Sequence, residues 1–140
     1  PSGYDEVVFC GFGESTERLD VLKEIAGYLK GRGSKVRLDT NGLGDLINGR
    51  PICEELKGLI DTICISLNTN IEEEYQKLCH SEYDDQAYPA LISFIKSARD
   101  YIPDVMISIV GMPEIDVEAC RKIAEDLGVR FRVREYNNVG

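Results

Sequence analysis

Four apolar stretches in this chain each lead directly into a short segment rich in glycine and polar residues. These segments are Gly11-Phe12-Gly13-Glu14, Thr40-Asn41-Gly42, Ser66-Leu67-Asn68 and Gly111-Met112-Pro113-Glu114. Glycine lets the backbone approach a ligand closely, because it has no Cβ atom. Amide and hydroxyl groups suit the hydroxyls and carboxylates of a small molecule, and a carboxylate suits an ammonium group. The repeated pattern therefore predicts a small-molecule site assembled from several loops.

The elements that must position these segments are predicted to alternate between strands and helices. A buried strand is expected at residues 7–10, and further strands at 35–39, 62–66, 105–110 and 131–133. The first helix is expected to carry Glu17 in its first turn and to end at Gly31 and Gly33, and further helices are expected at 71–78, 88–100 and 116–127, with short helical turns within 43–58. The first helix is expected to be capped by Ser15 or Thr16. Helices between successive strands predict an α/β fold with a parallel sheet. In such folds ligands bind at the carboxyl ends of the strands, where the four polar segments lie.

Length and charge narrow the possible functions. A chain of 140 residues predicts one domain, residues 1–140. A net charge of −9 argues against binding to nucleic acid or to an anionic membrane, because such binding needs clustered Lys and Arg. The sequence has no apolar run long enough to span a membrane and no recognisable secretion leader. We therefore expect a cytoplasmic protein that binds a small molecule.

The cysteines favour a reducing compartment. There are five of them, at positions 10, 53, 64, 79 and 120. Their odd number and wide spacing disfavour a disulfide framework, and no two are close enough to form a metal knuckle. Cys10 and Cys64 lie in apolar, strand-like stretches and are expected to be reduced core residues.

The motifs GFGEST, DTNG, SLNTN and IVGMPE, in this order and spacing, resemble the radical S-adenosylmethionine (radical SAM) superfamily. Within it, the chain is most similar to the small proteins linked to TatD-type nucleases. The resemblance covers nearly the whole chain. It implies strands 2–6 of a partial (β/α) barrel of parallel strands, with the helices on the outer face. It also implies an enzyme that cleaves S-adenosylmethionine reductively to a 5′-deoxyadenosyl radical, which acts on an unidentified substrate.

The resemblance assigns cofactor contacts to the polar segments. It implies that Gly11, Gly13 and Glu14 contact the amino group of S-adenosylmethionine, and that Asn41 lies near the ligand. The remaining implied contacts are Ser66 and Asn68 near the carboxylate and ribose, and Ile109 and Gly111 around the adenine. Arg134 and Asn137 follow the last strand and can reach the same site. No catalytic residue is assigned.

One departure from the family is large. The superfamily holds a [4Fe-4S] cluster on a CxxxCxxC loop, and this chain has no such motif. Cys10 does not replace it, because a cluster needs several thiolates. No metal ligand is therefore assigned. The chain is expected to be the C-terminal part of a radical SAM protein that is inactive alone.

Two other functions remain open. The chain could be a non-catalytic α/β module that binds a ligand or a partner. A flavodoxin-like nucleotide binder is a weaker alternative, because the sequence has no hydroxyl-rich phosphate loop. An exposed sheet edge would also allow a homodimer to form.

Overall fold

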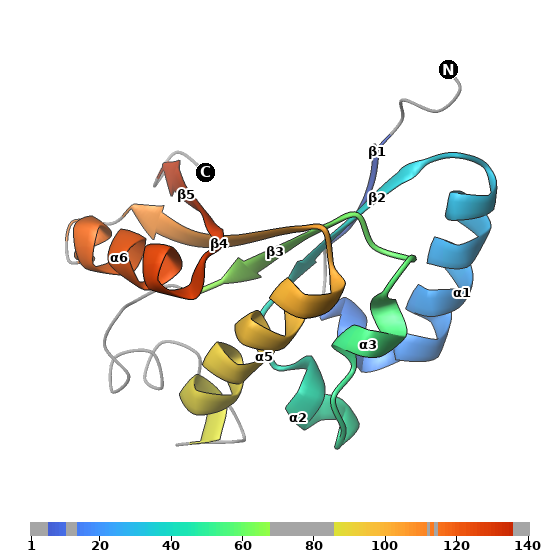
Figure 1. Ribbon diagram of the computed structural model, residues 1–140, viewed down its shortest axis with the longest axis horizontal. Coiled ribbons are helices and arrows are strands. Elements are labelled where there is room, and N and C mark those ends of the chain that lie inside the picture. The colour runs from blue at the N-terminus through green and yellow to red at the C-terminus, as the bar shows by residue number, and fades with distance from the viewer. Residues whose placement is uncertain (1–5, 11–13, 68–85, 112, 114, 136–140) are drawn as a thin grey trace.

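A five-stranded parallel sheet forms the centre of the protein. The computed structural model describes residues 6–10, 14–67, 86–111, 113 and 115–135. The strands are β1 (Glu6–Phe9), β2 (Lys35–Thr40), β3 (Thr62–Ser66), β4 (Asp104–Gly111) and β5 (Arg130–Glu135). They lie side by side in chain order, and every neighbouring pair is parallel (Figure 1).

The sequential strand order places the helices on one face of the sheet. Each crossover advances by one strand in the same direction, and right-handed crossovers then return on the same side. The helical segments are η1 (Ser15–Arg18), α1 (Leu19–Gly31), α2 (Gly44–Asn48), α3 (Cys53–Leu56), α5 (Ala87–Tyr101) and α6 (Val117–Leu127). Figure 1 shows them gathered below the sheet, whose opposite face carries no helix of the described residues. We call this opposite face the open face.

The core lies between the sheet and the helices. Alternate residues of the inner strands point into it and are fully buried, among them Leu38, Ile63, Ile65 and Ile107. Leu91, Phe94 and Ile95 of α5 meet them from the helix layer and are equally buried. Burial of apolar side chains on this one face provides the main stabilisation of the layer.

The structure confirms the predicted fold class. It is an α/β fold whose parallel sheet is open and does not close into a barrel. The helices expected at 88–100 and 116–127 correspond to α5 and α6. Asp116 caps α6 by accepting a 3.0 Å hydrogen bond from the backbone N–H of Ala119, and Gly128 ends it in the left-handed conformation. The helix predicted at 71–78 lies outside the described residues.

Three expectations at the amino end were wrong. The carboxylate of Glu14, not Ser15 or Thr16, caps the first helical turn. The first strand is not buried, because β1 is an edge of the sheet and the side chain of Val8 is 39% exposed. Cys10 is likewise exposed, whereas Cys64 is buried as expected.

None of the helices in the described ranges has the length and apolar character needed to cross a membrane.

Replacing Gly42 with Ala should destabilise the fold by about 2–4 kcal/mol. Gly42 has φ +78°, a conformation that strains any residue with a Cβ. That Cβ would also lie 2.9 Å from Cγ2 of Ile65 and would collide with Leu91 in the core. Urea unfolding measures the loss.

Gly49→Ala is the matched control. Gly49 also has positive φ, at +67°, but no atom lies within 4 Å of the position its Cβ would take. Gly49→Ala should lower the free energy of unfolding by only about 1 kcal/mol, because it adds backbone strain at positive φ but no steric clash. Equal losses for the two variants would show that the space around Gly42 is not tightly packed.

Candidate functional site

The carboxyl edge of the sheet gathers part of the predicted site. Glu14 follows β1, Asn41 follows β2, Ser66 ends β3 and Gly111 ends β4. Gly11, Gly13 and Asn68 lie outside the described residues. Of the five described positions of the predicted site, which also include Ile109 on β4, Glu14 and Asn41 are joined directly, by a hydrogen bond between the Asn41 backbone and the Glu14 side chain.

The Glu14 carboxylate connects the loops that follow β1 and β2. Its Oε2 accepts hydrogen bonds from the backbone N–H of Thr16 at 3.1 Å and from the Thr16 hydroxyl at 2.7 Å. The Thr40 hydroxyl donates to the same oxygen at 2.6 Å. Oε1 accepts from the backbone N–H of Asn41 at 2.8 Å. The threonines are buried, so the carboxylate satisfies polar groups that water reaches poorly.

This arrangement leaves the negative charge of Glu14 without a cationic partner among the described residues. All four of its hydrogen bonds come from neutral donors. Three of the four hydrogen bonds go to Oε2, whereas Oε1, which has two lone pairs, accepts only one. Oε1 uses one of its two, so it can accept one more donor, and the charge favours an ammonium group.

The side chain of Asn41 is held in place by a hydrogen bond to its carbonyl oxygen, whereas its NH₂ group bonds to no other described residue. Its Oδ1 accepts a 2.9 Å hydrogen bond from the backbone N–H of Leu43, which also fixes the orientation of the amide group. No hydrogen bond occupies Nδ2 within the described part of the chain. The exposed side chain therefore presents two N–H donors to an incoming carboxylate or hydroxyl.

Ser66, Ile109 and Gly111 differ in their access to a ligand. The half-buried Ser66 points to the open face, and its hydroxyl makes no hydrogen bond to other described residues. Ile109 is 1% exposed and packs in the core on the opposite face, so its side chain does not reach the carboxyl edge. A Cβ on Gly111 would lie 3.0 Å from Cγ1 of Val133, so glycine allows β4 and β5 to pack closely there.

Among the arginines of β5, the sequence interpretation named only Arg134 as a residue that can reach the site. Residues 130–135 read Arg-Phe-Arg-Val-Arg-Glu, and alternate side chains of a strand point to the same face. Register with β4 places Arg130, Arg132 and Arg134 on the open face, beside Met106, Ser108 and Val110. The alternation was visible in the sequence, but only the sheet shows that no helix of the described residues covers this face.

Two ion-pair groups cover the middle of the open face. Arg37 and Asp39 on β2 make hydrogen bonds of 2.7 and 3.3 Å, and Nη2 of Arg134 lies 3.7 Å from Oδ2 of Asp39. On the other side, Arg130 donates two hydrogen bonds of 2.7 and 2.6 Å to Asp104. The bonds from Arg130 hold the pKa of Asp104 below its usual range.

The contact between Arg134 and Asp39 bridges two intervening strands. In a flat sheet β2 and β5 would lie about 14 Å apart. Strand side chains stand roughly perpendicular to the sheet, so the contact indicates that the sheet curves toward its open face. Cys64, Met106 and Ser108 point to this face yet are only 2%, 6% and 2% exposed. Long arginine side chains can cover such residues, because their stems are aliphatic.

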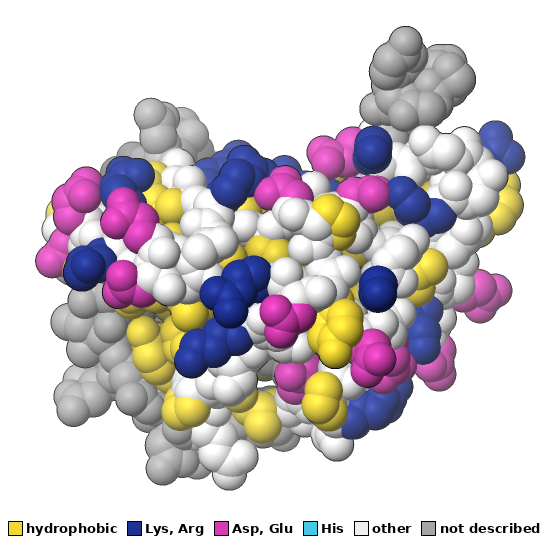
Figure 2. All heavy atoms as spheres, viewed as in Figure 1, with side chains coloured by type: hydrophobic (Ala, Val, Ile, Leu, Met, Phe, Trp, Pro, Cys, Tyr) yellow, Lys and Arg dark blue, Asp and Glu magenta, His cyan; other side chains and the backbone are white. Residues whose placement is uncertain are grey.

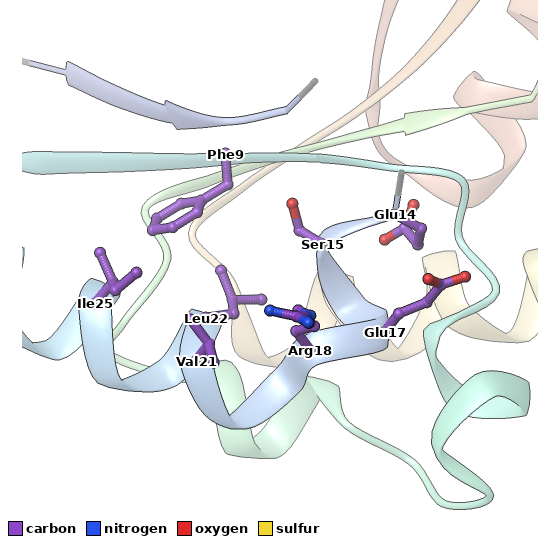
Figure 3. A pocket seen from close by; sticks show the side chains of 8 residues that line it. All are labelled: Phe9, Glu14, Ser15, Glu17, Arg18, Val21, Leu22 and Ile25. Carbon is purple, nitrogen blue, oxygen red and sulfur yellow. The ribbon is translucent and has the colours of Figure 1, made fainter. Parts of the chain in front are cut away.

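A separate pocket lies between β1 and α1. It has a volume of about 300 Å³ and is lined by Phe9, Glu14, Ser15, Glu17, Arg18, Val21, Leu22 and Ile25. Figure 3 shows Phe9 reaching from β1 toward Leu22 and Ile25 of α1, with Glu14 and Glu17 at the opposite end. The pocket is on the helix side of the sheet edge, so it is distinct from the open face.

The described residues do not fit an iron-sulfur cluster. Within them, no three His, Cys, Asp or Glu side chains come together in a way that could hold a metal ion. Cys53, Cys64 and Cys120 are buried in the fold, and burial raises the pKa of the Cys53 thiol to about 12. The three thiols lie on α3, β3 and α6, so they are not gathered on one loop as in CxxxCxxC.

Glu14→Gln should destabilise the protein by about 2 kcal/mol, measured by urea unfolding. A glutamine has one acceptor oxygen in place of two and brings an NH₂ group that would face the donors of Thr16, Thr40 or Asn41. At least one donor would then lose its partner.

Glu24→Gln on the exposed side of α1 is the control, and it should change stability by less than about 0.5 kcal/mol. If the two variants unfolded alike, the Glu14 carboxylate would not be what connects the loops.

Comparison with known proteins adds no assignment. No model of a known protein family matches the sequence, and no curated protein sequence is significantly similar to it.

Proposed function

We propose that this chain is the S-adenosylmethionine-binding part of a radical SAM protein, corresponding to strands 2–6 of its barrel. The observation that carries the proposal is the sequential parallel sheet, with helices on one face and polar residues at its carboxyl edge. This architecture fits part of a (β/α) barrel, where ligands bind at the same edge. The order of the four polar motifs along the chain agrees with it.

The described residues offer complementary groups for the methionyl part of the cofactor. Glu14 has a negative charge that no described cation pairs and one open acceptor position, which suit the amino group. Asn41 presents amide donors that bond to no other described residue, which suit the carboxylate. Ser66 adds, on the neighbouring strand, a hydroxyl without a partner in the described part of the chain. Gly11, Gly13 and Asn68 belong to the same proposal, as does an adenine contact with the backbone around Ile109 and Gly111, because the Ile109 side chain lies in the core.

We further propose that the chain alone does not catalyse the reaction. S-adenosylmethionine supplies an activated sulfonium bond, but its reductive cleavage needs an electron donor. The described residues have no ligand set for the cluster that serves this purpose in the superfamily. The four described cysteines are free thiols, which supports a reducing, cytoplasmic location.

Titration calorimetry should show that the chain binds S-adenosylmethionine more tightly than adenosine or ATP. Asn41→Ala and Ser66→Ala should each weaken binding about fivefold, because each removes hydrogen-bonding groups from the carboxyl edge. Neither side chain supports the core, so both variants should keep their folded circular dichroism spectrum.

Ser34→Ala is the matched control. Ser34 is half-buried like Ser66 but directly precedes β2, at the amino end of the sheet, and the substitution should leave affinity unchanged. Equal affinity for all three ligands, or an equal loss in Ser34→Ala, would refute the proposed site. After anaerobic incubation with iron and sulfide, we expect no absorbance from a bound cluster. Stoichiometric cluster formation would refute the assignment to a part lacking the ligands.

A second candidate function is a partner-binding module that pairs through the β1 edge. Three apolar residues of α1 are exposed beside that edge: Val21 at 45%, Ile25 at 42% and Tyr28 at 63%. They recur at positions i, i+4 and i+7, so they form a stripe on one side of the helix. The unpaired backbone of an edge strand can extend a sheet into a second copy.

In this second case, Ile25→Glu should convert a dimer into a monomer, as measured by light scattering. The carboxylate introduced by this substitution would stay solvated in the monomer but would be buried in the dimer, and burying an unpaired charge disfavours association. Val133→Glu is the control, because Val133 is 38% exposed on β5, at the other edge of the sheet. A wild-type protein that is monomeric, or a dimer lost only in the Val133 variant, would contradict pairing through β1.

A further inference from the structure

The open face of the sheet is more basic than the protein as a whole. Strand register places five cationic and three anionic side chains on it, although the chain has a net charge of −9. The cations are Lys35, Arg37, Arg130, Arg132 and Arg134, and the anions are Glu6, Asp39 and Asp104. Figure 2 shows Lys and Arg side chains gathered along the top of the molecule, above the sheet.

The ion pairs leave part of this positive charge unneutralised. Asp104 is occupied by Arg130, and Asp39 by the close hydrogen bonds of Arg37. Arg134 has only a longer contact with Asp39, at 3.7 Å. Arg132 is exposed and has no ionic or hydrogen-bonding partner among the described residues. The excess charge therefore lies at the carboxyl half of β5.

The position of Arg132 is electrostatically unfavourable without an anion. It stands between Arg130 and Arg134 on the same face of one strand, two residues from each. Like charges at such spacing repel each other, and the repulsion is reduced when a counter-charge binds between them. A bound oxyanion would supply that charge.

A hydroxyl lies in the same row as Arg132. Ser108 of β4 is directly opposite Arg132 in the strand register, and adjacent strands are about 4.8 Å apart. The hydroxyl of Ser108 makes no hydrogen bond to another described residue. The Arg134 side chain reaches across β4 and β3 to within 3.7 Å of Asp39, and its guanidinium adds a second charge to the row when it turns back from that long contact.

We infer that Arg132, Arg134 and Ser108 form a binding site for an oxyanion group, a phosphate or carboxylate, on the open face of the sheet. A guanidinium presents a planar fork of donors that matches two oxygens of such a group at once. Ser108 is 2% exposed, so its hydroxyl can donate to a third oxygen once the bound anion draws the neighbouring arginine side chains aside. This inference does not depend on S-adenosylmethionine, and it gives the open face a ligand class of its own.

The test is a titration of the full chain with inorganic phosphate, and in a second arm with acetate, followed by NMR. The Nε–Hε signals of Arg132 and Arg134 should shift together as the anion binds. Arg132→Gln should weaken phosphate binding at least about tenfold, and Ser108→Ala about threefold. Arg132→Lys should fall between wild type and Arg132→Gln, because it keeps the charge but loses the fork.

Arg18→Gln is the matched control. Arg18 is also an exposed arginine without an ion pair to another described residue, but it lines the pocket on the helix side of the sheet. Its substitution should leave phosphate affinity unchanged. Unchanged phosphate affinity in Arg132→Gln would overturn the site, because Arg132 would then not bind the anion. An equal loss in Arg18→Gln would also overturn it, because the anion would then respond only to the overall charge of the protein.

The two proposals fail separately. If Arg132→Gln loses phosphate binding and the wild-type protein does not bind S-adenosylmethionine, the oxyanion site is supported and the proposed function is refuted. If the wild-type protein binds S-adenosylmethionine but phosphate binding does not depend on Arg132, the proposed function is supported and the oxyanion site is refuted. The preference between phosphate and acetate identifies which oxyanion the site takes.

Discussion

The one-directional order of the five parallel strands is the constraint on which the rest of this structure depends. Because each right-handed crossover returns on the same side, the helices and the apolar core occupy one face of the sheet. A parallel sheet normally has both faces covered. Here the second face carries charged side chains, and register places arginines of β2 and β5 on the same face as buried residues such as Cys64 and Met106.

Polar groups at the carboxyl edge have two different tasks. The Glu14 carboxylate is first a structural group, because it satisfies the donors of Thr16, Thr40 and Asn41 and so joins two loops. It retains a charge that no cation among the described residues neutralises. Asn41 is similar, since its oxygen accepts a hydrogen bond that holds the turn and its NH₂ group has no partner among the residues that the structure describes. In both residues, hydrogen bonds within the fold hold one end of the side chain and thereby orient the other end. A group that is already oriented loses less entropy when a ligand binds, which favours binding.

Electrostatics on the open face follow from strand register. The arginines of β5 project on one side because strand side chains alternate, and the acids of β2 and β4 partly neutralise them. The pairing is uneven, since Arg130 and Arg37 have close partners and Arg132 has none among the described residues. An acidic protein thus has a local basic surface, which net charge alone does not reveal.

Local pattern in the sequence determined the strands, the helices α5 and α6, and the parallel α/β class, because periodicity and helix-end residues such as Asp116 and Gly128 act over a few positions. It also located the polar segments that end the strands. It could not show that Glu14 caps a turn and bonds to Thr40, a residue 26 positions away, or that Ile109 faces the core. Nor could it show that β1 is an edge, or that Arg134 reaches Asp39. Those features depend on which strands become neighbours and how the sheet curves, and only the tertiary structure decides both.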